Sequence, residues 1–158
     1  MDVLITGSTG MVGKSVLNEC INDDRIGKIY LINRVPVNLK SSKVYEFILD
    51  DFLRMSELKN KINHCDACFH CMGITSFGQK SDYYYRVTFE MTKLLTDLVY
   101  EINPNSVMTY VSGEGTSKNE KSKITWANVK GKAENYILNK GLKDAYMIRL
   151  GLLIPENG

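Results

Sequence analysis

Three glycines spaced three residues apart, directly after a short apolar segment, constrain the fold of this chain more than any other feature. Residues 3–5, Val-Leu-Ile, predict a short buried strand. Gly7, Gly10 and Gly13 follow it, while an apolar stripe at helical spacing begins at Met11 and Val12. The N-terminus therefore predicts a strand, a tight turn and a helix, in that order.

The chemistry of this turn suits a phosphate. Gly7 permits backbone conformations closed to other residues, Gly10 lets a pyrophosphate approach the backbone, and Gly13 lets the helix approach the strand. The helix N-terminus offers unpaired N–H groups, and Ser8 and Thr9 add hydroxyl groups. A glycine-rich loop without a ligand is the alternative. The strand before the turn and the helix after it favour a dinucleotide diphosphate.

Size and composition indicate one domain and exclude several classes of protein. With 158 residues, of which 44% are hydrophobic, the chain can form a single core. The net charge is only +2, and the lysines of residues 117–132 alternate with acidic and amide residues, so we expect no nucleic-acid partner. No apolar run approaches the roughly 18 residues that a membrane span needs, and no leader precedes the first strand. We therefore expect a cytoplasmic protein.

Three cysteines have a spacing that can indicate a metal site. Cys65, Cys68 and Cys71 form a C-x-x-C-x-x-C pattern. Residues 67–71 predict a buried strand, however, and side chains three apart on a strand point to opposite faces. We therefore expect no metal site. We expect His70, inside this strand, to be a hydrogen-bonded structural residue rather than a base.

Strands and helices alternate along the rest of the chain. Further strands are predicted at 28–33, 44–49, 67–71, 106–111 and 145–150. The first helix is predicted to end near residues 22–25, and later helices are predicted at 54–62, 81–102 and 125–139. The connections are too long for hairpins, so the pattern predicts a right-handed, doubly wound parallel sheet of the α/β class.

The end of the second predicted strand distinguishes between two dinucleotides. In a dinucleotide-binding fold, an acidic residue there binds the 2′-hydroxyl of NAD, whereas an arginine accepts the 2′-phosphate of NADP. This chain has Asn33 and Arg34 there, without a carboxylate. The planar guanidinium group favours NADP, with NAD still open; a solvent-exposed arginine is the alternative. Lys40 or Lys43 could bind the same phosphate.

Two later strand ends also carry candidate ligand contacts. Asp51 and Phe52 follow the third strand and could contact the adenine, although Asp51 could equally cap the next helix. The fourth strand leads into Cys71, Met72 and Gly73, where glycine again permits a close approach of the backbone to a ligand.

Four segments together resemble the short-chain dehydrogenase/reductase superfamily, in its extended and atypical branches of NAD-dependent epimerase/dehydratase type. They are TGSTGMVG, the strand end DACFHCMG, YVSG and WANVKGKAEN. The resemblance covers essentially the whole chain and implies a Rossmann-type sheet of order 3-2-1-4-5-6 that binds NADP or NAD. The implied cofactor contacts are Gly7, Ser8, Thr9, Gly10, Met11, Val12, Gly13, Arg34, Asp51, Phe52, Cys71, Met72, Gly73, Lys130, Leu150 and Gly151.

The resemblance also implies a catalytic set with one departure. Members use a serine after the fifth strand, a tyrosine, and a lysine four residues after that tyrosine. By position, Ser112 is the serine, Lys130 is the lysine that binds the nicotinamide ribose, and Trp126 occupies the tyrosine position. An indole N–H donates a hydrogen bond but cannot shuttle a proton near neutral pH. The cofactor-binding part of the set is therefore retained, and the proton-transferring part is not.

Other departures leave the function open between two classes. Arg149-Leu150-Gly151 has leucine where relatives usually have proline, and the substrate-binding portion that normally follows is expected to be short or missing from this single domain of residues 1–158. We expect an NADP-favouring, epimerase-like oxidoreductase of a small, unidentified substrate, with water or one of Tyr83–Tyr85 relaying the proton. The alternative is a non-catalytic NADP(H)-binding sensor or regulatory module. The helices at 81–102 and 125–139 could pair in a homodimer, as they do in relatives.

Overall fold

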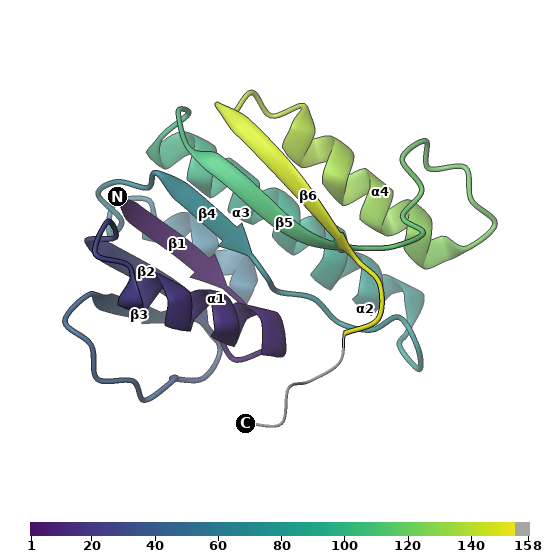
Figure 1. Ribbon diagram of the computed structural model, residues 1–158. Coiled ribbons are helices and arrows are strands. Elements are labelled where there is room, and N and C mark those ends of the chain that lie inside the picture. Colours follow the sequence, from purple (N-terminus) through teal and green to yellow (C-terminus); the bar gives the residue numbers. More distant parts are fainter. Residues whose placement is uncertain (154–158) are drawn as a thin grey trace.

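The computed structural model describes residues 1–153, which form a six-stranded parallel sheet with helices on both faces (Figure 1). The strand order β3-β2-β1-β4-β5-β6 confirms the predicted order. The strands are β1 (Asp2–Thr6), β2 (Lys28–Asn33), β3 (Val44–Ile48), β4 (Ala67–His70), β5 (Val107–Gly113) and β6 (Asp144–Leu150). The helical segments are α1 (Met11–Asn22), η1 (Phe52–Leu58), α2 (Ser81–Tyr85), η2 (Arg86–Glu90), α3 (Met91–Ile102) and α4 (Thr125–Leu138).

The direction of chain progression explains why the helices lie on two faces. From β1 to β3 the chain moves toward one edge of the sheet, and from β4 to β6 it moves toward the other. Because crossovers between parallel strands are right-handed, α1 lies on one face and α3 and α4 lie on the opposite face (Figure 1). The order reverses between β1 and β4, so a crevice opens there beyond the carboxyl ends of the strands.

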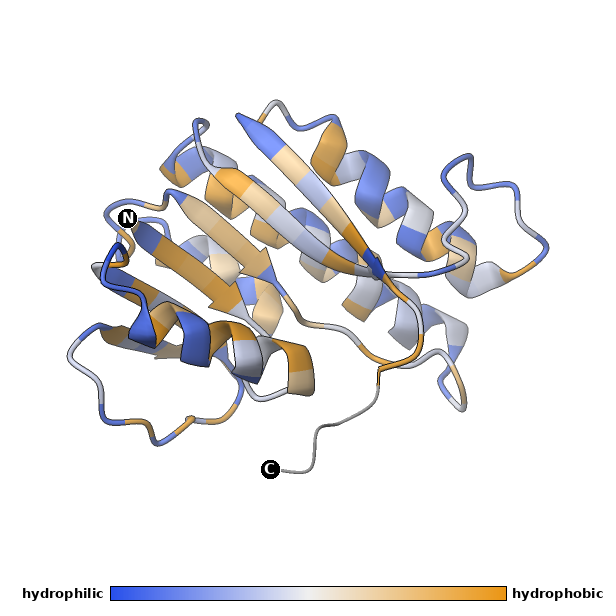
Figure 2. Cartoon of the chain, viewed as in Figure 1, coloured by the Kyte–Doolittle hydropathy of each residue, from blue (hydrophilic) through white to orange (hydrophobic). Residues whose placement is uncertain are grey.

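The alternation of side chains along β1 divides the core into two parts. Val3 and Ile5 pack with Leu17 and Cys20 of α1. Leu4 points the other way and joins the larger core beneath α3 and α4. The central strands β1 and β4 are among the most hydrophobic segments in Figure 2, as expected for parallel strands covered on both sides.

The short helix predicted at 54–62 is a 3₁₀ helix with earlier bounds, Phe52–Leu58. Asp51 starts it early, because its carboxylate accepts a hydrogen bond from the Leu53 N–H at 2.9 Å. The buried residues Phe52, Met55 and Leu58 recur at a spacing of three. That spacing matches the three residues per turn of a 3₁₀ helix, so each of these side chains faces the core.

The single helix predicted at 81–102 contains a π-helical segment, η2, between α2 and α3. Its signature is the bond from the Met91 N–H to the Arg86 carbonyl oxygen, five residues earlier. The Thr92 hydroxyl donates to the Thr88 carbonyl oxygen at 2.7 Å. Thr96 repeats this pattern toward the Thr92 carbonyl oxygen, and such side-chain bonds compete with regular helical bonding.

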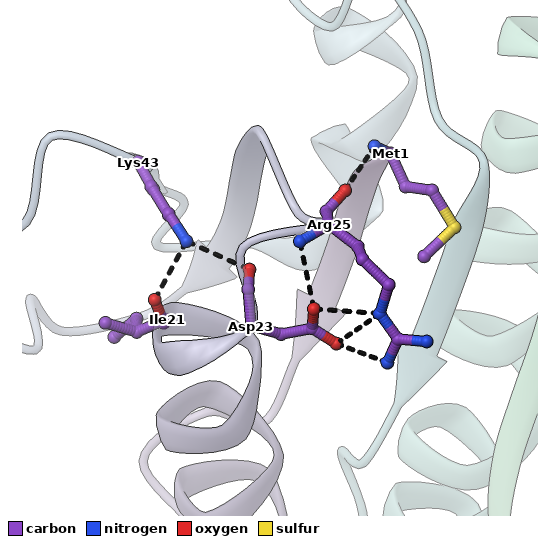
Figure 3. A network of polar contacts seen from close by, with 5 residues as sticks. All are labelled: Met1, Ile21, Asp23, Arg25 and Lys43. Atoms are coloured by element: carbon purple, nitrogen blue, oxygen red, sulfur yellow. Dashed lines mark hydrogen bonds and ion pairs between the residues drawn. The ribbon is translucent and has the colours of Figure 1, made fainter.

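Lys43 lies at the carboxyl end of α1, so the prediction that it could contact a phosphate beside Arg34 is wrong. Its Nζ atom donates to the carbonyl oxygens of Ile21 and Asp23, both at 3.0 Å (Figure 3). The Ile21 carbonyl group lies in the last turn of α1, where carbonyl groups lack partners within the helix, and the Asp23 carbonyl oxygen also accepts from the Ile26 N–H at 3.0 Å. The lysine charge complements the helix dipole at this end. The Asp23 carboxylate binds the Arg25 guanidinium in the same cluster.

Within residues 1–153, none of the helices combines the length and the hydropathy that crossing a membrane would require. The same residues contain no group of three His, Cys, Asp or Glu side chains placed to hold a metal ion. Cys65 and Cys68 are fully buried, whereas Cys71 is only half-buried at the carboxyl end of β4.

Candidate functional site

Two of the three glycines in the turn between β1 and α1, Gly7 and Gly13, have no room for a side chain. Gly7 has φ +72°, and a Cβ there would lie 2.6 Å from the Met72 nitrogen and 2.7 Å from the Cys71 carbonyl carbon. A Cβ on Gly13 would overlap the carbonyl oxygen of Gly7. The turn is therefore held against the end of β4 on one side and against α1 on the other, as a dinucleotide-binding turn requires.

The first turn of α1 is open to a ligand. Gly10 is its N-cap and has no side chain to bind the first amides, and the turn contains no acidic residue. Its unpaired N–H groups and the positive end of the helix dipole favour an anion.

A cavity of about 370 Å³ lies directly beside this turn, at the crevice between β1 and β4. Apolar side chains from η2 and α3, Val87 and Met91, close one wall. Among the predicted cofactor contacts, those that line the cavity are Gly7, Thr9, Gly10, Arg34, Phe52, Cys71, Met72 and Gly73. Ser8, Met11, Val12, Gly13, Asp51, Lys130, Leu150 and Gly151 are not among its lining residues.

The candidate contacts at the strand ends differ in how they lie relative to the cavity. Arg34 is exposed at the rim, and Asn33 lines the cavity while almost fully buried. Phe52 contributes its ring to the wall. Asp51 instead caps η1 and lies 3.7 Å from the Arg86 guanidinium, so the capping alternative describes its contacts.

Ser112 lies near the carboxyl end of β5, buried, with its hydroxyl already engaged. The Thr116 hydroxyl donates its only proton to the Gly113 carbonyl oxygen at 2.7 Å. Ser112 is therefore the donor in its 3.1 Å contact with the Thr116 oxygen. To polarise a substrate carbonyl, the Ser112 hydroxyl would have to rotate away from Thr116.

Trp126 and Lys130 lie one turn apart on α4 and cover the turn that follows β5. A Cβ on Gly115 would lie 3.3 Å from the Trp126 ring, and a Cβ on Gly113 would lie 3.7 Å from Lys130 Cδ and Cε. Lys130 Nζ lies 5.5 Å from the centroid of the buried Tyr110 ring. Burial lowers the pKa of Lys130. The fold therefore brings Ser112, Trp126 and Lys130 together around one turn.

Leu150 and Gly151 flank the same turn from β6. Leu150 is paired with Gly113 in the sheet, and a Cβ on Gly151 would lie 2.9 Å from Glu114 Oε2. Arg149 fixes this end of β6 to α4, because its guanidinium donates to both oxygens of the buried Glu134 carboxylate, at 3.1 and 2.6 Å.

The profile of the NAD dependent epimerase/dehydratase family matches residues 3–149. The chain belongs to this family. No curated protein matches the sequence.

Solved structures with the same fold include proteins with bound dinucleotides. Bordetella bronchiseptica WbmH in complex with NAD+ superposes with a TM-score of 0.73 at 13% identity, over 92% of this chain and 54% of that one. A short-chain dehydrogenase from Burkholderia cenocepacia in complex with NADP gives 0.77 at 10% identity, over 94% and 71%. The oxidoreductase ylbE from Lactococcus lactis gives 0.77 at 22% identity, over 99% and 72%. This family member spans about half the length of WbmH.

His70 links the end of β1 in this family member to α3 and is neutral. The Thr92 hydroxyl donates to the Thr88 carbonyl oxygen, so His70 Nε2 must donate to Thr92 at 2.8 Å. His70 Nδ1 then accepts from the Thr6 hydroxyl at 2.7 Å. Burial, together with the charge of Lys130, lowers the pKa of His70 to about 3. These bonds agree with the predicted structural role.

The three tyrosines of α2 have three different surroundings, and one of them faces the cavity as predicted. Tyr83 lines it and is 44% exposed. Tyr84 is buried, and burial raises its pKa. The Tyr85 hydroxyl accepts a hydrogen bond from Lys132 Nζ at 2.8 Å.

Two polar residues beside the site were missed by the sequence analysis. Thr116 engages the Ser112 hydroxyl, and the Glu46 carboxylate accepts a hydrogen bond from the Asn33 amide at 2.7 Å. Alternation along the third strand could have placed Glu46 on the face opposite Tyr45 and Phe47. No local signal indicated which residues its carboxylate would bind.

Proposed function

We propose that this chain binds NADP(H) at the turn after β1 and acts as an epimerase-like oxidoreductase on a small substrate. The carrying observation is the 370 Å³ cavity that joins the uncapped N-terminus of α1 to the exposed Arg34 guanidinium. The amides would hold the diphosphate, and the guanidinium would pair with a 2′-phosphate. The NADP complex of the Burkholderia cenocepacia structure, which has the same fold, is consistent with this choice.

The residues of the chain fit such a cofactor at both ends. Gly7 lets the turn pack against the backbone of Met72, and Gly10, which also lacks a Cβ, would let a diphosphate approach the backbone. Lys130 lies beside the turn after β5 and would bind the hydroxyls of the nicotinamide ribose. When bound, NADP(H) would supply or accept a hydride. The substrate then needs only a hydrogen-bond donor and a proton source from the protein.

Ser112 would be the hydrogen-bond donor to the substrate. The proton source is less well provided for, because Trp126 occupies the position where relatives have a tyrosine. Ser112 would polarise a carbonyl group after releasing Thr116. Trp126 cannot give up a proton near neutral pH. Among the tyrosines of α2, only Tyr83 lines the cavity, so Tyr83 or water would relay the proton.

Binding and turnover are tested separately. Calorimetric titration of the protein with NADPH and with NADH should show saturable binding, with the lower Kd for NADPH. The oxidation of NADPH should then be measured by absorbance in the presence of each member of a panel of carbonyl, quinone and flavin acceptors. At least one substrate class should support oxidation. The absence of binding by both dinucleotides would rule out the proposal.

A second candidate is a non-catalytic module that binds NADP(H) and signals its level to a partner. Two observations favour it: Trp126 in the tyrosine position, and the Ser112 proton engaged by Thr116. The same assays separate the two functions, because tight NADPH binding without oxidation by any acceptor would support the module. A flavin accepts a hydride without a strong general acid, so turnover restricted to flavins would instead indicate a flavin reductase.

A further inference from the structure

A chain of hydrogen bonds, buried at Ser8 and Asn33 and partly buried at Glu46, connects the glycine turn to the end of β2, just before Arg34. The Ser8 hydroxyl donates to Asn33 Oδ1 at 2.8 Å. Asn33 Nδ2 donates to Glu46 Oε1 at 2.7 Å. Glu46 belongs to β3, next to β2 in the sheet. Both Ser8 and Asn33 are almost fully buried, with 2% and 3% of their surfaces exposed.

The chemistry of these groups fixes the orientation of the Asn33 amide. An ionised carboxylate only accepts hydrogen bonds, so Asn33 must turn Nδ2 toward Glu46. Its oxygen then faces Ser8 and accepts the hydroxyl proton. Asn33 is thereby committed to internal bonds, although it stands where a carboxylate would bind the 2′-hydroxyl of NAD.

Glu46 also binds the backbone on the far side of Arg34, at Val37. The Val37 N–H donates to Glu46 Oε1 at 3.0 Å and lies 3.3 Å from Oε2. One carboxylate oxygen therefore binds both the side chain of Asn33 and the backbone of Val37. Between these two anchors lie only Arg34, Val35 and Pro36, and proline further restricts the backbone.

From this arrangement we infer that Glu46 sets the selectivity for NADP over NAD by positioning the segment that carries Arg34. The inference rests on the proposed function, because it concerns the same cofactor. Glu46 is a positioning residue and does not itself line the cavity. Its anchors hold residues 34–36 in place, so the guanidinium meets a 2′-phosphate without first ordering the segment. NADH lacks that phosphate and gains nothing from the positioning.

Two conservative substitutions separate the geometry of Glu46 from its charge. Glu46→Gln removes the charge but keeps an oxygen at the Oε1 position, which can still accept from both Asn33 and Val37. Glu46→Asp keeps the charge but withdraws the oxygens by one methylene. We expect Glu46→Asp to raise the Kd for NADPH about tenfold and to change that for NADH by less than about twofold, while Glu46→Gln stays near the wild type.

The matched control is Glu19→Asp, an exposed carboxylate on α1, which should leave both affinities unchanged. The double variant Arg34→Ala/Glu46→Asp tests whether Glu46 acts through Arg34. If it does, Glu46→Asp causes no further loss of NADPH affinity in the Arg34→Ala background.

Each other result overturns the inference in a recognisable way. Equal weakening of NADPH and NADH by Glu46→Asp would reduce Glu46 to a general structural residue. Tighter NADPH binding in Glu46→Gln would show that the carboxylate repels the 2′-phosphate instead. A wild-type protein that binds neither dinucleotide would contradict the proposed function and the inference together. Binding of both without preference would contradict the inference and the preference for NADPH, while dinucleotide binding at the turn after β1 would still stand.

Discussion

The turn after β1 and the turn after β5 lie at the same edge of the sheet, but they differ in the functional groups that surround them. The first has close-packed glycines, uncapped amides and an adjoining cavity, which are the features a dinucleotide diphosphate needs. The second has Ser112 and Lys130, with Trp126 one helical turn before Lys130, at the position where the family resemblance implies a tyrosine. If the proposed function holds, the difference teaches that cofactor binding and proton transfer belong to separate parts of this fold.

The largest expected effect is a gain in rate when a proton donor is placed beside the turn after β5. Trp126→Tyr places a phenol one helical turn before Lys130, and a positioned general acid typically contributes a factor of about 10² to 10⁴ in rate. NADPH oxidation with the best acceptor should rise by that order while the Kd for NADPH stays constant. Trp126→Phe is the control and should not raise the rate. An unchanged rate in Trp126→Tyr would mean that Trp126 does not occupy the tyrosine position.

The next effect concerns His70, which lies between the two turns. Its pKa is about 3 in the folded protein and near 6.5 when unfolded, so below pH 6.5 the unfolded chain binds the proton more readily. Stability should therefore fall as the pH drops, by about 4 kcal/mol between pH 6.5 and pH 3. His70→Gln should remove this part of the pH dependence in urea unfolding. His64→Gln, at an exposed histidine, should retain it; parallel curves for both variants would contradict the account.

A smaller effect tests the close packing of the first turn. Gly7 and Gly78 have nearly the same φ, +72° and +75°, but a Cβ would meet backbone atoms only at Gly7. Gly78→Ala should cost about 1 kcal/mol from the backbone conformation, and Gly7→Ala about 3 kcal/mol, because steric overlap is added. Thermal unfolding of both variants measures the difference. Equal costs would show that the turn does not need its contact with β4.

The smallest effect sharpens the assignment of the cofactor. Arg34→Ala should weaken NADPH binding about tenfold and leave NADH binding unchanged, because only NADPH has the 2′-phosphate. Arg54→Ala, which removes an exposed arginine paired with Glu57, is the control. A loss of equal size for NADH would place Arg34 elsewhere on the cofactor.

The sequence predicted the fold well because its signals were local and strong. Alternating strands and helices, with connections too long for hairpins, led to the observed parallel sheet. The errors arose where several structures share one pattern. Apolar residues three and four apart do not reveal a π-helical segment at Arg86–Glu90, and the helix predicted at 54–62 begins earlier, at Phe52, and ends at Leu58.

The site was less predictable, because its polar partners come from distant parts of the chain. The glycine turn could be placed from the glycine spacing together with the strand before it and the helix after it, and it lines the cavity at Gly7 and Gly10. Lys43 looked available but binds carbonyl groups about 20 residues earlier in the chain. Glu46 looked like an ordinary strand residue but holds Asn33 and Val37. Such bonds are determined by tertiary structure, which residue spacing does not encode.

The most direct test of the central claim is calorimetric titration of the unmodified protein with NADPH. The account predicts saturable binding with one dinucleotide per chain, and a loss of that binding in a variant that fills the turn with a side chain at Gly7. If heat is not exchanged at millimolar NADPH or NADH, and neither dinucleotide raises the melting temperature, the turn after β1 does not bind a dinucleotide.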